Sequence, residues 1–88
     1  MAYYQKRVFE SIEVITHHTY DDMKILKFKW HNRVYKVSKL NSKWVVPSVD
    51  DFIDTHFSVI CNEANMVAEL KYYHKDFKWE LIQWDSLV

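Results

Sequence analysis

The absence of glycine constrains the fold of this chain more than any other feature. Its 88 residues include no glycine and a single proline, so the turns need other residue types. They must be made by Asn, Asp, His and Ser, of which Asn and Asp tolerate a positive φ best. The candidate breaks are the short polar segments at residues 16–22, 31–32, 41–42, 47–54, 62–65 and 75–76.

The segments between these breaks are typical of β-strands. They are rich in Val, Ile, Phe, Tyr and Trp, and most of them alternate apolar with polar residues at a period of two. We predict six strands, at residues 7–16, 23–30, 33–46, 55–61, 66–74 and 77–85. The third strand is long, and we expect it to bend or bulge near Asn41.

Three hairpins have registers that agree with this assignment. A two-residue turn at 31–32, a four-residue loop at 62–65 and a two-residue turn at 75–76 each align apolar residues on one face. The predicted pairs are Trp30 with Arg33, Phe28 with Tyr35, Leu26 with Val37, Phe57 with Leu70, Val59 with Ala68, Cys61 with Met66, Tyr72 with Trp79 and Leu70 with Leu81. We therefore predict an all-β fold, a six-stranded antiparallel meander that forms a small closed or partly open barrel.

Length and composition indicate one small domain over residues 1–88. A domain of this size buries roughly 60 to 65% of its unfolded surface, which leaves little room for an enclosed pocket. With 49% hydrophobic residues the chain should fold alone, and we expect residues 1–6 to fray. The lone cysteine, the lack of a signal-like start and the lack of an apolar run near ~20 residues predict a soluble cytoplasmic protein.

The net charge of zero conceals a strongly basic segment. Residues 23–43 carry a charge of +7, against −2 for residues 1–22, −4 for residues 44–65 and −1 for residues 66–88. Within the basic segment, aromatic residues alternate with the cations, so it reads as a positively charged β-hairpin suited to an anionic partner. The basic residues are Lys24, Lys27, Lys29, Arg33, Lys36, Lys39 and Lys43.

The register of this hairpin suggests that its charge is neutralised from outside. It places Lys27 opposite Lys36 and Lys24 opposite Lys39, and like charges directly across two strands are unfavourable. The last hairpin instead places Lys71 opposite Glu80. A nucleic-acid backbone would neutralise the cations through contacts that carry no sequence information. The candidate contacts are Lys24, Lys27, Lys29, Arg33, Lys36 and Lys39.

Other interpretations of these lysines stay open. They can form a solvated strand surface, or they can protect an edge strand from pairing. They can also bind an acidic protein partner, including a second copy of the chain in a homodimer. The predicted aromatic pairs share the core face, which weakens the idea that these rings stack on bases.

The acidic segment at residues 48–54 offers such a partner surface. It could form one helical turn with Ser48 as its cap and Asp50 and Asp51 near the positive end of the helix dipole, or it could be an acidic loop. Its spacing lacks the ligands and the glycine of a calcium loop. We expect Asp50, Asp51 and Asp54 to face the basic hairpin, within the monomer or across a dimer.

The remaining polar residues predict no catalytic or metal site. The five histidines match no zinc pattern, and turn polarity accounts for four of them. Cys61 falls on the core face of its strand and is expected to be an inert buried thiol. The chain has no Gly-rich phosphate loop and no Ser/His/Asp order, so we predict a non-enzymatic binding domain without a cofactor.

The order of several residues resembles a family of small bacterial domains of unknown function. This chain has Trp30-x-x-Arg33-x-Tyr35-x-Val37, then Trp44, Phe57-x-Val59, Glu69-Leu70-x-x-Tyr73 and Trp79-x-Leu81. The family has W-x-G-R-x-Y-x-V, a later Trp, Y-x-V, E-L-x-Y and a closing W-x-L, so the resemblance covers roughly residues 8–84. Asn32 stands where the family has glycine, and Phe57 replaces a Tyr.

The resemblance implies a stand-alone bacterial protein with structural rather than catalytic motif residues. Some members of that family lie beside components of error-prone DNA polymerases, which the resemblance implies only as context. Asn can adopt the backbone shape of the replaced glycine, so the hairpin is expected to persist.

Overall fold

The computed structural model describes residues 6–87 and confirms the all-β fold. The predicted fraying of residues 1–5 lies outside the described part, whereas Lys6 is the first residue of β1 and pairs with Trp84. The elements are β1 (Lys6–His18), β2 (Met23–Trp30), β3 (Arg33–Lys36), β4 (Lys39–Pro47), a short 3-10 helix η1 (Val49–Asp51), β5 (Ile53–Cys61), β6 (Met66–Tyr73) and β7 (Lys78–Ser86).

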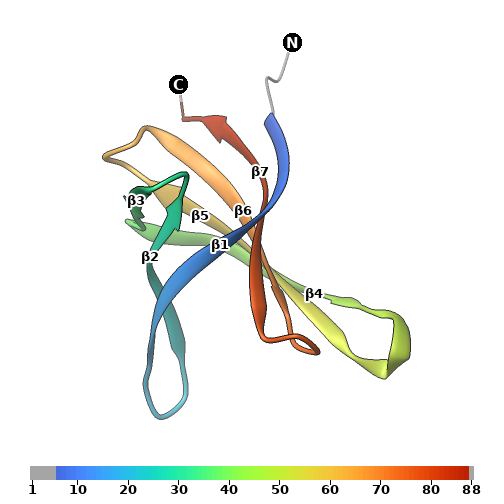
Figure 1. Cartoon of the computed structure of the whole chain (residues 1–88). Coiled ribbons are helices and arrows are strands. Elements are labelled where there is room, and N and C mark those ends of the chain that lie inside the picture. Colours follow the sequence, from blue (N-terminus) through green and yellow to red (C-terminus); the bar gives the residue numbers. More distant parts are fainter. Residues whose placement is uncertain (1–5, 88) are drawn as a thin grey trace.

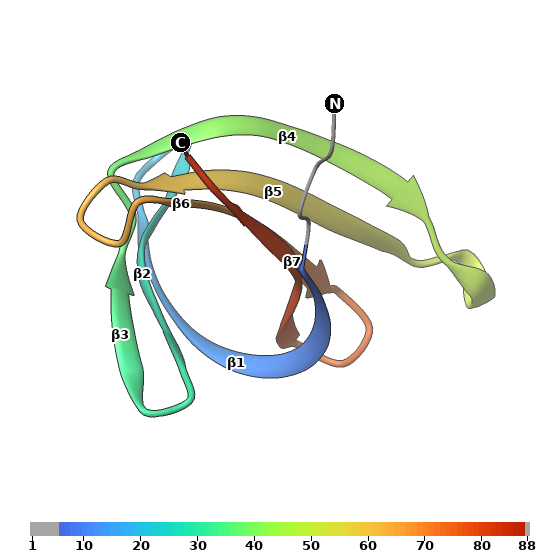
Figure 2. The ribbon, with the colours of Figure 1, turned by 90° about the horizontal axis from the view of Figure 1, so that it is seen from above.

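The seven strands form one antiparallel sheet that curls into a partly open barrel (Figures 1 and 2). Its order is β3-β2-β1-β7-β6-β5-β4, so two meanders are joined where β1 pairs with β7. The first half of β1 pairs with β7 and the second half with β2, which lets this long strand bend around one side of the barrel. The predicted meander is therefore confirmed.

The predicted third strand is two strands, because the chain turns a corner at Val37 and Ser38. The N–H of Val37 donates to the carbonyl of Leu26 at 2.9 Å, while the N–H of Ser38 donates to the carbonyl of Ile60 at 2.7 Å. Two consecutive residues thus bond to opposite ends of the sheet, which places the edge strands β3 and β4 on either side of the opening. A bulge also occurs at Asn41, as predicted, where the register shifts between Leu40 and Ser42.

Most turns use the residue types predicted for a glycine-free chain, but in the last turn the positive φ of 54° falls on Phe77. His31 and Asn32 form the predicted two-residue turn with φ values of 51° and 61°, the geometry that suits a right-twisted hairpin. Asn65 adopts φ 52° at the end of the four-residue loop. The last hairpin turns over residues 74–77 rather than 75–76, yet its predicted register is unchanged because Tyr73 pairs with Lys78.

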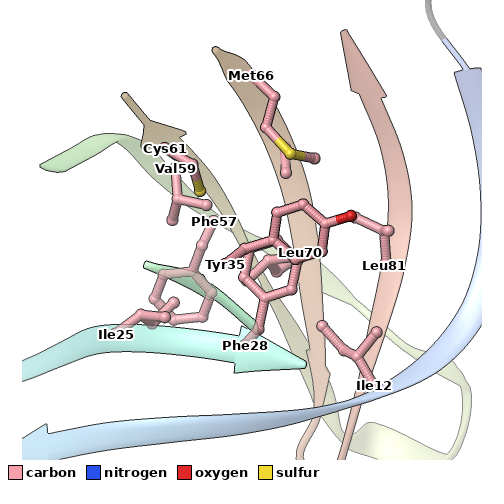
Figure 3. Close-up of a cluster of buried hydrophobic side chains, with 11 residues drawn as sticks. Ile12, Ile25, Phe28, Tyr35, Phe57, Val59, Cys61, Met66, Leu70 and Leu81 are labelled. Carbon is pink, nitrogen blue, oxygen red and sulfur yellow. The ribbon is translucent and has the colours of Figure 1, made fainter. Parts of the chain in front are cut away.

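The core lies inside the curl, where six of the seven strands contribute buried side chains (Figure 3). All the predicted pairs of the two later hairpins are observed there, including Leu70 with Leu81. Leu26 is a correction, because it is 45% exposed and Ile25 is buried in its place. Leu26 is the extra residue of a bulge opposite Ile15 and Thr16, which reverses the alternation of β2.

Candidate nucleic-acid interface

Three of the predicted cations gather on the outer face of the β2–β3 hairpin. Phe28 and Tyr35 stack at 5.1 Å between ring centroids on the inner face and are buried there. Since side chains alternate along a strand, Lys27, Lys29 and Lys36 point outward. Lys27 lies directly opposite Lys36, as the sequence predicted. This outer face therefore concentrates positive charge.

Lys24 and Lys39 lie at a different place. The predicted pair of these two lysines is wrong, because Lys24 pairs with His17 in β1 and Lys39 pairs with Ile60 in β5. The corner at residues 37–38 separates them, since the chain has already left the hairpin when it reaches Lys39. Both lysines line a hollow of about 480 Å³ between β2 and β4, at the open side of the barrel.

Arg33 lies beside the turn of the hairpin and on its inner side. Its guanidinium carbon is 4.9 Å from the ring centroid of Tyr35, a cation–π contact. Six cations predicted as one surface are thus divided among the outer face, the opening and the turn.

The same turn is held by a carboxylate from β1. Trp30 Nε1 donates to Glu10 Oε1 at 3.1 Å, and His31 Nε2 lies 2.7 Å from the same oxygen. The hydrogen bonds from Trp30 and then His31 lower the pKa of Glu10 below its usual value. Glu10 therefore anchors the turn, and its bonds go to Trp30 and His31 rather than to a lysine of the hairpin.

No carboxylate pairs with any of the six predicted cations within residues 6–87. The ion pairs made by lysines are Lys71 with Asp54 at 3.6 Å and Lys75 with Asp50 at 2.7 Å. Glu13 is the register partner of Lys29 but forms no ion pair with it. The positive charge of the hairpin is thus not neutralised by the described part of the chain.

The acidic segment does not face the basic hairpin within the monomer. Asp50 and Asp54 bind lysines of the turn after β6 and of β6 itself, at the other side of the sheet. The short 3-10 segment η1 lies where the helical turn was predicted, but Asp50 and Asp51 have left-handed φ values of 66° and 63°, so it is not a regular right-handed turn, and Ser48 makes no side-chain cap. Its backbone N–H bonds instead to the carbonyl of Phe52 at 2.9 Å.

The outer face of β4–β7 carries a polar network that supports the sheet. His56 Nδ1 is 2.8 Å from Glu69 Oε2, and Gln83 Nε2 donates to Glu69 Oε1 at 2.8 Å. The ring of Trp44 stacks on His56 with centroids 5.3 Å apart. These groups satisfy one another, so His56 has a structural role in the described fold.

Cys61 is buried in the core, as its strand position predicted. Its side chain has no exposed surface, and burial raises the pKa of the thiol to about 11. A thiol with such a pKa stays protonated at neutral pH and is a poor nucleophile.

Sequence reasoning missed a group of residues on the inner side of the opening. Tyr72, His74 and Trp79 are only partly buried there, and Lys43 lies over Phe57 with its Nζ 5.7 Å from the ring centroid. The predicted pair of Tyr72 with Trp79 is observed, but neither ring is fully buried on the apolar face where both were predicted. The exposure of these rings depends on where the barrel stays open, which no local pattern reveals.

No group of three or more His, Cys, Asp and Glu side chains in the described range could hold a metal ion. Across residues 6–87 there is also no helix with the length and apolar character to cross a bilayer.

Comparison of the chain with family models, curated proteins and solved structures found no match. The resemblance to the small bacterial family therefore stays a prediction.

Proposed function

We propose that this protein is a non-enzymatic domain that binds nucleic acid weakly and without sequence preference. The binding residues are Lys24, Lys27, Lys29, Arg33, Lys36 and Lys39. One observation carries the proposal: none of these cations has a carboxylate partner within the described chain. Cations left unmatched on the outer face, at the opening and beside the turn suit a polyanion whose chain passes all three.

The pair formed by Lys27 and Lys36 adds a physical reason. Two like charges directly across a pair of strands destabilise the hairpin by roughly 0.2–1 kcal/mol relative to neutral residues. A phosphate between the two strands would remove this repulsion and release condensed counterions. The outer face then binds the sugar-phosphate backbone of the nucleic acid and makes no sequence-specific contact with the bases.

A second candidate function is a protein interaction module, and the exposure of β4 favours it. Every residue of this nine-residue edge strand is exposed, including Leu40, Trp44, Val45 and Val46. An exposed apolar edge can pair with a strand of another chain, including a second copy. Docking through Asp50 and Asp54 is less favoured, because both already bind lysines. A concentration-dependent dimer in light scattering would support this candidate.

The proposal is tested by titrating the protein with a fluorescent deoxythymidine strand of about 16 nucleotides between about 50 and 200 mM salt. With six phosphate contacts on a single strand, a plot of the logarithm of the association constant against the logarithm of the salt concentration should have a slope of about −4. Loss of two contacts in the Lys27→Gln/Lys36→Gln variant reduces this slope by about 1.4.

The matched control is Lys75→Gln/Lys78→Gln, which removes the same charge from the far end of the β6–β7 hairpin. Lys75 is paired with Asp50, and Lys78 contacts the ring of Tyr73. This control is expected to keep most of the wild-type slope. An absence of binding at the lowest salt, or an equal loss in both variants, would refute the proposed surface.

A further inference from the structure

We propose that the open side of the barrel holds unpaired bases, so that the protein binds single strands in preference to duplexes. This inference rests on the proposed function and adds the part of the ligand that the lysines do not contact. It starts from a groove of about 380 Å³ between the β1–β2 hairpin and the strands β4 to β7. That volume is within the range of pockets that hold small planar ligands.

Aromatic rings form one wall of this groove. Trp79 lies 4.9 Å from Tyr72 and 5.3 Å from Phe57 between ring centroids, and Tyr72 lies 4.8 Å from His74. Phe57 is buried beneath the others, whereas Tyr72, His74 and Trp79 are partly exposed. Rings with an accessible face act as stacking platforms for bases of any identity, since every base has a π-face.

The polar groups of the groove suit a polyanion that presents bases. Lys43 lies at its rim with Nζ 5.7 Å from the Phe57 ring, and no carboxylate pairs with it among the described residues. Thr55 Oγ1 and His74 Nε2 are 2.8 Å apart on the same wall as the rings, where they can also bond to a base edge. None of the residues that line the groove is acidic.

The groove continues toward the cations of the proposed interface. Met23 and Phe57 line both this groove and the hollow of about 480 Å³ that Lys24 and Lys39 border. A strand laid along the opening can therefore place phosphates on Lys24, Lys39 and Lys43 while its bases point inward to the rings. A duplex cannot do so, because its bases are stacked and paired.

The test compares two ligands of equal length and phosphate charge, a deoxythymidine strand and a fully abasic strand. Base stacking on the rings predicts that the abasic strand binds the wild-type protein at least tenfold more weakly at the same salt. The matching duplex should also bind more weakly than the single strand. Neither comparison requires a variant that alters the core.

The place of contact is tested by NMR with the same two ligands. The indole signal of Trp79 should shift when the deoxythymidine strand is added, and it should stay in place with the abasic strand. Lys43→Gln should weaken binding of the single strand several-fold, with Lys75→Gln as the control of equal charge. Both lysines are exposed, so neither change should disturb folding.

The outcomes separate this inference from the function on which it rests. Equal binding of the deoxythymidine and abasic strands, with a steep salt dependence for both, would overturn the base groove and keep the electrostatic interface. Absence of binding by either strand would overturn both. Preference for the base-bearing strand without any shift at Trp79 would also overturn the groove, because the bases would then contact another surface.

Discussion

The hairpins β2–β3 and β6–β7 both carry lysines on their outer faces, but they treat these charges in opposite ways. In β6–β7, Lys71 is the register partner of Glu80, and its Nζ lies 3.6 Å from Asp54 Oδ2. In β2–β3, Lys27 faces Lys36, and neither lysine forms an ion pair within the described residues. The lysines of β6–β7 include two that pair with carboxylates of the fold, whereas the lysines of β2–β3 make no ion pair within the described residues.

Aromatic side chains differ between the two hairpins in the same way. The hydroxyl of Tyr73 in β6 donates a hydrogen bond to Glu80 Oε1 at 2.8 Å. The ammonium groups of Lys71 and Lys78 lie over the Tyr73 ring. Burial, together with the bond to Glu80, raises the pKa of Tyr73 to about 12. Glu80, Lys71 and Lys78 therefore all contact Tyr73 on this face.

The largest expected effect comes from breaking an ion pair of β6–β7. Lys71→Gln leaves the carboxylate of Asp54, whose side chain is 10% exposed, without a charge partner. We expect the free energy of unfolding to fall by about 1–3 kcal/mol, measured by urea denaturation. Lys78→Gln on the same face is the control, since Lys78 lies over the Tyr73 ring and forms no ion pair within residues 6–87. Equal losses in the two variants would show that the pairing with Asp54 contributes nothing.

A smaller effect is expected at the one carboxylate that contacts the β2–β3 turn. The pKa of Glu10 is lowered in the folded protein. The ionised side chain therefore contributes to stability when the pH is above 4.5, the usual pKa of a glutamate. That contribution is lost as the pH falls through the lower, folded value. The stability difference between wild type and Glu10→Gln should therefore be largest near neutral pH and shrink below pH 4.5.

Urea denaturation across this pH range checks the prediction. Glu13→Gln is the control, because Glu13 is exposed and makes no hydrogen bond or ion pair in the structure of residues 6–87. A difference for Glu10→Gln that is the same at neutral and acidic pH would contradict an ionised anchor at the turn.

The pairing within hairpins could be predicted from the sequence because it depends on local information. Once the turn at 31–32 or 62–65 is fixed, the register follows from counting, and each apolar residue then falls on one face. The glycine-free turns did not prevent this, since His31, Asn32 and Asn65 adopt positive φ themselves. Registers such as Phe57 with Leu70 were therefore predictable.

The features that the sequence could not predict depend on closure of the sheet. The bulge at Leu26 and the corner at Val37 and Ser38 arise because strands distant in sequence must meet around one core. Closure of the sheet also explains why Lys39 pairs with Ile60 rather than with Lys24, and why Asp50 forms an ion pair with Lys75. The candidate interface was thus predicted as a set of cations, but its division among separate surfaces was not.

The stability of Lys27→Gln/Lys36→Gln in urea, a denaturant that leaves ionic strength unchanged, shows whether the fold requires these two charges. If these lysines serve a partner rather than the fold, the free energy of unfolding should stay the same or rise by up to about 1 kcal/mol. The same sample should bind the single strand more weakly than wild type does. A loss of stability greater than about 1 kcal/mol would contradict the account, because it would show that the fold itself requires these charges.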